Sequence, residues 1–472
     1  MPTMLTLPAP TTDNPAAPQP MAGLKDRMLR AAGWLFAGNL SAQLLRLTSS
    51  LILTRLLVPE AFGLMAAVNT LYFGLLMFSD LGIWQSVVRS RHGTDMRFLG
   101  TAWMIQFLRG VLIALGVLLL ALAVDAGAAR GWFGAGTVYA DPILPELIAV
   151  FALCALLQGA ESMQLATAQR DLAARPMVRL ELVTQVATIL FMVAAAWVTR
   201  SVWALLAGTV LGAALKTALS YLMLPGRGVR PCWDAGFARE IIGFGKWIFL
   251  SSLIGFLALQ GEKLILGGLL GIAAFGVFSI ASNLFAAMVG LYSTLNGRVI
   301  YPSLTHVLQQ DNSVALHQAY TRMQWLADLI LGSVSGLLLL AGQWIIVLLY
   351  DARYADAGWM LQCLGLGLLA MRHQVLEQLM FALGRPGWVT ANNALRAVCL
   401  LVFIPAGFAL DGARGALWGV VLSQFASWPL SLRFKHEHGL LGWSTERGWP
   451  IGLLAGLAAG WLIDTVLARA LS

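Results

Sequence analysis

The sequence predicts an all-α polytopic membrane protein in which two six-helix bundles, related by an internal repeat, enclose a central cavity. The first observation is composition: the 472 residues are 58% hydrophobic and only 11% charged, whereas soluble domains carry about 25% charged residues. The second is that most of the chain lies in apolar stretches of roughly 20 residues, which is the length of a transmembrane helix. The third is that residues 34–63 recur without gaps as residues 247–276.

The repeat indicates that the chain consists of two related halves. Trp34 corresponds to Trp247 at an offset of 213 residues, and the same offset relates the Ala-Phe-Gly segments at 61–63 and 274–276. Repetition within an apolar chain is typical of transporters, in which one half closes against the other around a central site.

Thirteen apolar segments are long enough to be transmembrane helices, and they are too continuously apolar for the strands of a membrane barrel. Six lie in the first half: 31–54, 61–79, 98–124, 143–167, 177–198 and 202–224. Six lie in the second half: 241–266, 272–295, 325–350, 357–383, 391–410 and 415–434. The predicted organisation is a disordered cytoplasmic tail (1–30), an N-terminal bundle (31–224), a cytoplasmic connector (225–240), a C-terminal bundle (241–434) and an additional C-terminal transmembrane helix (449–468).

The distribution of Lys and Arg near the ends of the predicted helices gives the orientation. These residues gather on the side that carries the N-terminus, for example at Arg27, Arg97 and Arg175, and fewer lie on the opposite side. Because basic loops stay in the cytoplasm, we expect a cytoplasmic N-terminus. The net charge of +8 has the same explanation, basic loops beside anionic lipid, so no nucleic-acid partner is expected.

No pattern typical of a catalytic or metal site is present in the sequence. The four cysteines are scattered, without the spacing of a disulfide framework or a zinc site. No P-loop occurs, so ATP hydrolysis by this chain is not expected. No carboxylate pair or His-Asp cluster lies on a long loop, where a membrane enzyme would hold its chemistry. We therefore expect a protein that is not an enzyme and uses no cofactor or metal.

Four short motifs resemble those of polysaccharide transporters. Residues 53–63 (LTRLLVPEAFG) resemble the family's RLLGPEDFG signature, and residues 78–83 (FSDLGI) resemble the end of its second helix. Residues 262–278 (EKLILGGLLGIAAFGVF) are similar to its DRLLIGRLLG…LGLY segment, and residues 298–304 (RVIYPSL) to its RVLFPAFSRL run. The resemblance covers roughly residues 30 to 435. Two departures are Val58, where the family has Gly, and Glu262, where it has Asp.

By these motifs the chain is similar to the oligosaccharide flippases of the multidrug/oligosaccharidyl-lipid/polysaccharide superfamily. The resemblance implies two six-helix bundles that face each other across a central cavity. It also implies a substrate in which an oligosaccharide is linked through pyrophosphate to a polyprenol, flipped from the cytoplasmic to the periplasmic leaflet of the bacterial inner membrane. Membrane lipid and a polysaccharide polymerase are the further partners expected.

The first predicted helix carries a polar stripe at membrane depth. Arg46 lies roughly 20 Å along this helix at 1.5 Å per residue, and Asn39 and Gln43 share its face. An ionisable residue there costs about 2.5–3.5 kcal/mol, so the stripe should face the protein interior or water. We expect Arg46 to bind the pyrophosphate, because a guanidinium pairs bidentately with phosphate. The alternative is an internal salt bridge that fixes helix packing.

Other polar residues at membrane depth are candidates for the same site. Basic residues predicted to bind the pyrophosphate together with Arg46 are Arg109, Lys263 and Arg298. Residues predicted to line the cavity or to couple transport to a proton or sodium ion are Asn39, Gln43, Asp80, Glu262, Arg372 and Glu377. The alternative for each is pairing between helices, and for Lys263 extension to the membrane surface. Tryptophans near predicted interfaces, Trp84 among them, anchor helices there, although an indole can also stack on a sugar ring.

Three alternative functions stay open on the sequence. A drug exporter of the same superfamily would favour acidic residues in its cavity, whereas the deepest charges here are mostly basic. A second is an exporter of the lipid-linked cell-wall precursor. A third is a membrane-embedded enzyme of polysaccharide assembly, which the short loops and the internal repeat disfavour.

Overall fold

The computed structural model describes residues 21–79, 82–171, 173–224, 228–310 and 312–471. The first half contains α1 (Met21–Leu56), α2 (Pro59–Phe78), α3 (Ile83–Arg89), α4 (Met96–Ala129), α5 (Leu144–Gly159), α6 (Gln164–Arg170), α7 (Ala174–Thr199) and α8 (Val202–Leu222). The second half contains α9 (Ala235–Leu269), α10 (Ile272–Leu295), α11 (Tyr301–Leu308), α12 (Ser313–Leu349), α13 (Ala357–Ala370), α14 (Gln374–Ala382), α15 (Pro386–Phe425), α16 (Trp428–Glu437), α17 (Trp443–Glu446) and α18 (Gly448–Leu471).

The all-helical membrane fold expected from the sequence is confirmed. Within the described ranges no named strand forms, and eight helical segments are long and apolar enough to cross a membrane. The pair α5–α6, which is bent by 58°, brings this number to nine. α1 is not among the eight, since Asn39, Gln43 and Arg46 make its centre polar.

α15 contains two of the predicted spans in one long helical segment. Its backbone leaves the helical conformation at Asp411 and at Gly412, where φ is +53°. Glycine adopts this left-handed conformation without a steric penalty, so the chain can reverse there. Beyond the reversal Gly407 packs directly against the backbone of Gly415. The predicted segments 391–410 and 415–434 are therefore two antiparallel helices.

The beginnings of α1 and α9 differ from the predicted boundaries. α1 begins at Met21, so residues 21–30 of the expected tail are helical, while residues 1–20 lie outside the described part. Residues 21–32 are rich in Leu, Lys, Arg, Met and Ala, which are strong helix formers. α9 begins at Ala235, inside the predicted connector, because Asp234 caps it. The Asp234 carboxylate accepts hydrogen bonds from the backbone N–H groups of Gly236 (2.8 Å) and Phe237 (3.1 Å).

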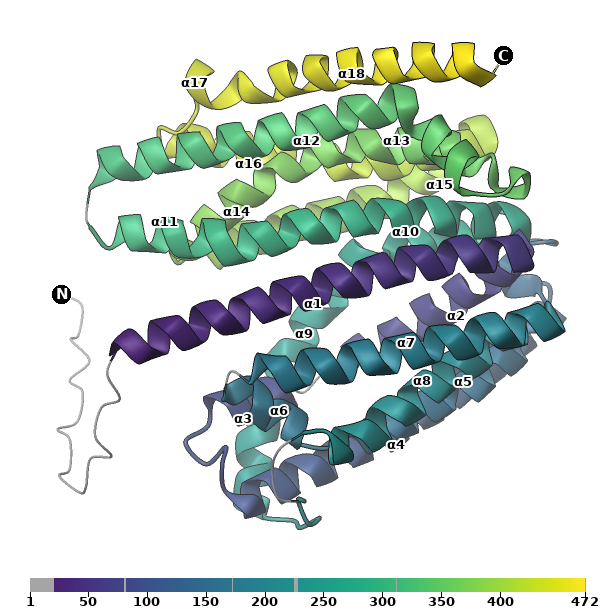
Figure 1. Ribbon diagram of the computed structural model, residues 1–472, viewed down its shortest axis with the longest axis vertical. Helices are drawn as coiled ribbons and strands as arrows, with labels where there is room; N and C mark the ends of the chain where they lie inside the picture. The colour runs from purple at the N-terminus through teal and green to yellow at the C-terminus, as the bar shows by residue number, and fades with distance from the viewer. Residues whose placement is uncertain (1–20, 80–81, 172, 225–227, 311, 472) are drawn as a thin grey trace.

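The helices form two groups that meet along α2, α9 and α10 (Figure 1). In the first half α4 packs on α5, α7 packs on α8, and α1 packs on α7. In the second half α12 contacts both α13 and α18, and α15 packs on α9. α2 contacts α9 and α10, so this helix is a principal link between the halves.

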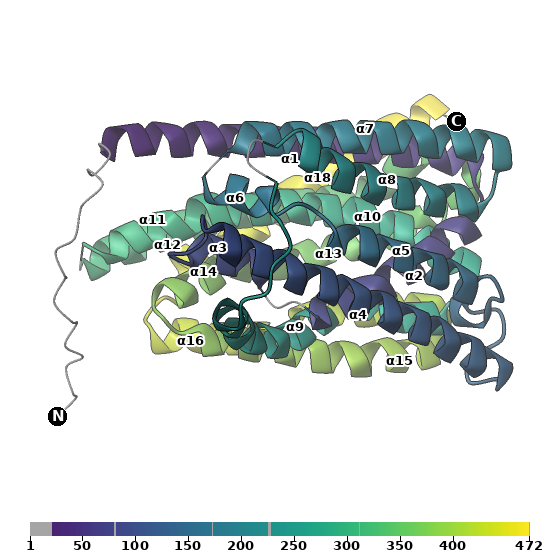
Figure 2. The same ribbon diagram turned by 90° about the horizontal axis from the view of Figure 1, so that it is seen from below.

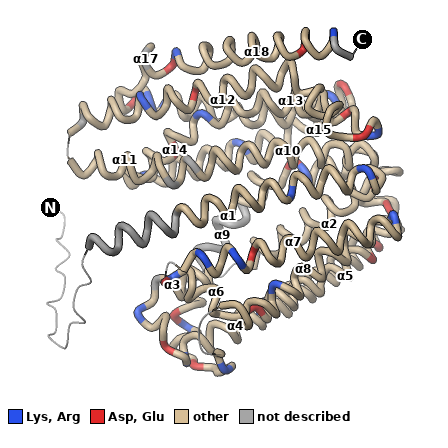
Figure 3. The backbone as a smooth tube through the Cα atoms, in the orientation of Figure 1, with Lys and Arg blue, Asp and Glu red and all other residues tan. Residues whose placement is uncertain are grey.

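The long helices run between two ends of the molecule (Figure 2). We call the end with α3, α6, α11 and α17 the near end, and the end with the α1–α2 and α9–α10 turns the far end. Long stretches of helix between the two ends carry no charge (Figure 3). This pattern is typical of helices that cross a membrane.

Reciprocal contacts join the two halves at the far end. A Cβ on Gly63 would lie 2.6 Å from the carbonyl oxygen of Ile272, and a Cβ on Gly276 would overlap the carbonyl of Pro59. Both pairs, Gly63 with Gly276 and Pro59 with Ile272, have the 213-residue offset seen in the sequence. Only glycine permits this close approach of α2 to α10.

Two tyrosines reinforce the far end from opposite halves. Tyr139, in the α4–α5 loop, donates a hydrogen bond to the carbonyl of Leu264 on α9 at 3.0 Å. Tyr354, in the α12–α13 loop, donates to the carbonyl of Leu57 at the α1–α2 turn, also at 3.0 Å. Each half therefore holds the turn of the other.

Candidate functional site

A cavity of about 670 Å³ lies between the two halves, and we call it the central cavity. It is lined by residues of α1, α2, α7 and α8 from the first half and of α9 and α10 from the second. Its polar lining includes Gln43, Ser50, Asn69, Gln260 and Asn283.

Among the described residues that line the central cavity, Arg46 and Lys263 are the charged ones, and none is a carboxylate. Arg46 is exposed. Within the part of the chain that is described, no carboxylate forms an ion pair with either cation. The salt bridge considered as the alternative for Arg46 is thus not seen there. The neighbouring Glu262 carboxylate attracts Lys263 electrostatically from outside the lining. The two cations that face the cavity still make it favourable for an anion.

Helical periodicity places these side chains. Gln43 and Arg46 are three residues apart on α1 and lie on the face that lines the cavity. Gln260 and Lys263 have the same spacing on α9. Asn39 is exposed on α1 but is not among the lining residues, because it lies further toward the near end.

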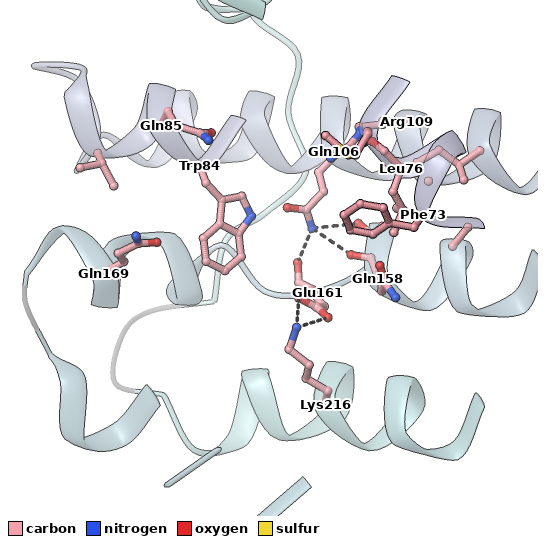
Figure 4. Close-up of a pocket in the computed structure, with 16 residues that line it drawn as sticks. Phe73, Leu76, Trp84, Gln85, Gln106, Arg109, Gln158, Glu161, Gln169 and Lys216 are labelled. Carbon is pink, nitrogen blue, oxygen red and sulfur yellow. Dashed lines mark hydrogen bonds and ion pairs between the residues drawn. The ribbon is translucent and has the colours of Figure 1, made fainter. Parts of the chain in front are cut away.

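A second cavity, of about 800 Å³, lies within the first half, and we call it the first-half cavity (Figure 4). Residues of α2, α3, α4, α5, α6 and α8 line it. Arg109, which was expected to share a site with Arg46, lies in this wall and not in that of the central cavity. The other residues that dominate the wall are Trp84 and four glutamines, Gln85, Gln106, Gln158 and Gln169, each from a different helix.

The charged groups of the first-half cavity are bound by protein partners. Arg109 donates through Nη2 to the carbonyl of Leu76 at 2.9 Å and through Nε to Ser79 Oγ at 3.2 Å. These bonds hold the end of α2 against α4. Lys216 Nζ lies 3.0 Å from Glu161 Oε1, so the second cation is paired with a carboxylate.

Gln106 has a structural role at the bend between α5 and α6. Its Nε2 donates to the backbone carbonyls of Gly159 (3.1 Å) and Glu161 (3.0 Å), which the bend leaves without helical partners. Gly159 packs backbone to backbone on Gly110 of α4 beside this bend. The bend shapes one wall of the cavity.

Phe73 on α2 lines both cavities. Its side chain is exposed to a fraction of 36%. The two cavities therefore lie on either side of this residue and are adjacent.

The structure corrects the expectation that Arg372 lines a cavity. Arg372 is only 1% exposed, and it is absent from the linings of both cavities. Its Nη2 lies 2.7 Å from Asp328 Oδ2 and its Nη1 lies 2.6 Å from Glu446 Oε2. Lys435 Nζ lies 2.7 Å from Glu446 Oε1. We call these four residues the ion network; its two cations are balanced by two carboxylates supplied by α12 and α17.

Glu446 is the member of the ion network that lies between membrane-spanning segments. Burial raises the pKa of this carboxyl, but the neighbouring Lys435 ammonium and Arg372 guanidinium outweigh burial and hold the pKa below its usual value. Glu446 therefore stays ionised at neutral pH.

Two carboxylates expected in the site lie deeper in the second half. Glu262 accepts a hydrogen bond from Ser282 Oγ at 3.4 Å and is not among the residues that line the central cavity. Glu377 lines a narrow space of about 10 Å³ together with Arg396 and Gln424. Arg396 donates to the Gln424 side chain.

Two further expected residues cannot be placed at the site. Arg298 belongs to a short π-helical segment (Asn296–Ile300) after α10, and its side chain lies outside the described part of the structure. Asp80 lies outside the described residues altogether.

The sequence reasoning missed the glutamines of the first-half cavity. Gln106 and Gln158 interrupt apolar segments, and this interruption is the signal that could have identified them as interior polar groups. Gln85 and Gln169 lie on the short helices α3 and α6, whose position at the near end depends on tertiary packing. Among the described residues no cluster of three or more His, Cys, Asp or Glu is placed to bind a metal ion.

Comparisons with known proteins identify the family of the chain. Residues 52–358 match the family model described as polysaccharide biosynthesis protein. The chain is 21% identical to the lipopolysaccharide biosynthesis protein WzxC of Escherichia coli strain K12 over 415 residues. This matched region covers 86% of this chain and 80% of WzxC.

Solved structures share the fold at low sequence identity. An inward-facing multidrug resistance MATE transporter of the MOP superfamily matches with a TM-score of 0.64 at 12% identity, over 91% of this chain and 96% of that one. The lipid II flippase MurJ in an inward closed conformation matches with a TM-score of 0.62 at 12% identity, over 92% of this chain and 98% of that one. The family model covers more than half of the sequence, so the chain belongs to the polysaccharide biosynthesis protein family, and it shares the fold of the MATE transporter and of MurJ.

Proposed function

We propose that the chain is a flippase that moves polyprenyl-pyrophosphate-linked oligosaccharide repeat units from the cytoplasmic to the periplasmic leaflet of the bacterial inner membrane. The product would serve exopolysaccharide or lipopolysaccharide assembly, in which a polymerase acts next. The observation that carries the proposal is the pair of cations, Arg46 and Lys263, in a central cavity where no described lining residue is a carboxylate. The charge of the pyrophosphate is the main obstacle to crossing hydrocarbon, and these two side chains offset it.

The two cations come from different halves of the molecule. Arg46 lies on α1 and Lys263 on α9. A guanidinium binds phosphate bidentately, and an ammonium binds it as a point charge. A pyrophosphate has two phosphates, so it can bridge the halves, and a ligand that bridges them can bias their relative position. This is the coupling that alternating access requires.

The far-end contacts support entry of the substrate from the near end in the described conformation. The hydrogen bonds of Tyr139 and Tyr354 join the halves at the far end. Basic residues such as Arg97 and Arg175 lie toward the near end, which we assign to the cytoplasm. The substrate then enters from the near end, and release requires the far-end hydrogen bonds to break.

The remaining candidate residues act around this site. Arg109 holds the end of α2 beside the first-half cavity. Glu262 and Glu377, inside the second half, are the carboxylates available for coupling to a proton or sodium ion. A drug exporter is the weaker assignment, because a cation would meet Arg46 and Lys263 with no carboxylate beside them in the lining.

Charge reversal at Arg46 tests the proposal. In Arg46→Glu, we expect polysaccharide export to fall below a hundredth of the wild-type level, because a carboxylate replaces the guanidinium at the phosphate position and loss of a charged hydrogen bond alone costs about 1.5–3 kcal/mol. Lipid-linked repeat units should accumulate on the cytoplasmic leaflet. Export is measured in the native host deleted for the chromosomal gene.

Arg91→Glu is the matched control, since Arg91 is exposed in the α3–α4 loop and lines neither cavity. It should export normally at the same membrane abundance. Normal export by Arg46→Glu at wild-type abundance contradicts the proposal. A cell-wall defect without loss of polysaccharide would instead assign the lipid-linked cell-wall precursor as substrate.

A further inference from the structure

The two cavities offer different chemistry to a ligand. The central cavity presents two cations, and no carboxylate is among its described lining residues. In the first-half cavity, by contrast, Arg109 is bound to the end of α2 and Lys216 is paired with Glu161. Lys216 is thus balanced by a carboxylate, and the guanidinium of Arg109 is engaged by neutral protein oxygens. The polar groups of this cavity that have no protein hydrogen bond in the described chain are neutral.

These neutral groups include glutamine amides. Within the described chain the side chains of Gln85, Gln158 and Gln169 make no hydrogen bond, although all three line the first-half cavity. A primary amide supplies two donors and one acceptor with two lone pairs. Sugar hydroxyls both donate and accept, so amides match them without requiring a charge. Three such groups from α3, α5 and α6 surround one space (Figure 4).

Trp84 supplies the apolar counterpart. Its indole is part of the lining and lies between Gln85 and Gln169 on one side and Gln106 on the other (Figure 4). The ring is half-buried and its N–H has no hydrogen-bond partner among the residues described. An indole combines a large apolar face with a polar edge. A pyranose has the complementary form, a face of C–H groups with hydroxyls around its edge.

Size and position fit the same ligand. The first-half cavity, of about 800 Å³, is within the range of roughly 300–1,000 Å³ typical of pockets for compact organic ligands, so a short oligosaccharide can enter it. Phe73 lines both cavities, so the two are adjacent. A glycan attached to phosphates at Arg46 therefore has the first-half cavity as its neighbouring space, on the other side of Phe73.

We propose that the first-half cavity is the glycan subsite of the transporter, in which Trp84 stacks on a sugar ring and Gln85, Gln158 and Gln169 bind hydroxyls. This inference rests on the flippase function proposed above. The substrate is then divided between two compartments, with the pyrophosphate between the halves and the uncharged glycan inside the first half. Selection among repeat units follows from the glutamines and Trp84, whereas Arg46 and Lys263 recognise the phosphates that all such substrates share.

Site-specific photo-cross-linking in the native host tests the inference on the natural substrate. The photoreactive residue p-benzoylphenylalanine replaces Gln85 in the first-half cavity, Asn69 in the central cavity, or Gln309, which is exposed at the end of α11 outside both. Cells are labelled with a radioactive sugar and with [³²P]phosphate. Mild acid then cleaves the bond between the first sugar and the pyrophosphate.

The expected result is an adduct with both labels at Gln85 and at Asn69, and none at Gln309. After acid, the Gln85 adduct keeps the sugar label and loses ³²P. The inference is overturned if Asn69 gives a doubly labelled adduct while Gln85 gives none, a phospholipid adduct without sugar, or an adduct that loses its sugar in acid. The absence of any sugar-labelled adduct at both positions would instead overturn the flippase function itself.

Removal of the amides gives an independent measurement. In Gln85→Leu combined with Gln169→Leu, we expect export to fall about tenfold, since each neutral hydrogen bond contributes a factor of a few. Binding of farnesyl pyrophosphate, which has no glycan, by the purified protein should stay unchanged. Gln309→Leu should alter neither quantity. Equal losses of export and of farnesyl pyrophosphate binding would indicate a structural defect and overturn the glycan assignment.

Discussion

The two halves are both built from long helices, but the space between those helices differs between them. The first half encloses a cavity of about 800 Å³ whose wall carries amides without hydrogen bonds. In the second half the ion network fills the space among α12, α16 and α17, and the space beside Glu377 measures only about 10 Å³. One half is therefore open to a ligand, whereas the other is closed by its own charges.

This difference indicates that the two halves have different roles. Buried ion pairs seldom add net stability compared with apolar packing, because both ions lose their hydration, but they penalise any arrangement in which a partner is missing. The ion network consequently fixes the relative positions of four segments of the second half. The first half gives up part of its packing to keep a cavity. A rigid half moving against a receptive half is sufficient for alternating access.

The largest effect that separates the halves should come from carboxylate-to-amide substitution. Asp328→Asn removes a fully buried carboxylate and leaves the network with uncompensated positive charge beside Arg372. We expect a loss of about 3–5 kcal/mol in the free energy of unfolding. Glu161→Gln in the first half leaves Lys216, whose side chain is 43% exposed, and should cost at most about 1 kcal/mol.

The stabilities of the two purified variants are compared by thermal unfolding, monitored by circular dichroism. The Asp328→Asn melting temperature should lie well below that of Glu161→Gln. Similar melting temperatures for the two variants would show that the second half is not held by its ion network. The division into a closed and an open half would then lose its physical basis.

The same valine-to-phenylalanine substitution in each half should give the second-largest difference in stability. Val375 on α14 is fully buried, and Val88 on α3 is 40% exposed and lines the first-half cavity. Val375→Phe should destabilise the protein by about 1–3 kcal/mol, because a packed core has no space for the ring. Val88→Phe should leave the melting temperature within error of the wild type and reduce export, since the ring occupies the cavity.

The outcome that contradicts the comparison is a loss of stability in Val88→Phe equal to that in Val375→Phe. It would mean that the first-half cavity is not available space. Unchanged export by a stable Val88→Phe would mean that the space is available but is not used by the substrate.

Periodicity was sufficient to predict the helices and one wall of the central cavity. Gln43 and Arg46 share a face because three residues nearly complete a helical turn, and this relation is readable from spacing alone. The apolar lengths gave the membrane helices for a similar local reason. Both predictions depend on residues within one helix, where the geometry is fixed by the backbone.

Pairing across the chain was not readable in this way. Arg372 is 44 residues from Asp328 and 74 residues from Glu446 in sequence, so its partners become visible only once α12, α16 and α17 are packed. The same is true of the first-half cavity, whose glutamines come from four helices. Arg109 was grouped with Arg46 by membrane depth, but depth gives no information about the face on which a neighbouring helix lies. The sequence therefore indicated which residues are interior but not which of them meet.

Acid titration of Glu446 should give the smallest effect and sharpen the comparison further. The pKa of this carboxyl is lowered in the folded protein, although burial opposes the shift, by Lys435 and Arg372. A carboxyl with a lowered pKa stabilises the fold fully above its unfolded pKa of about 4.3, and this contribution is lost as the pH falls through the lower folded value. The melting temperature should thus drop more steeply below pH 4.5 in the wild type than in Glu446→Gln.

The effect should be modest because the Glu446 side chain is 23% exposed and partly screened by solvent. If the melting temperature of Glu446→Gln falls with acid as steeply as that of the wild type, the Glu446 carboxylate is not the group that makes the fold sensitive to acid. The ion network would in that case fix the relative positions of its helices without adding electrostatic stability to the fold. The rigidity of the second half would then have to come from its apolar packing.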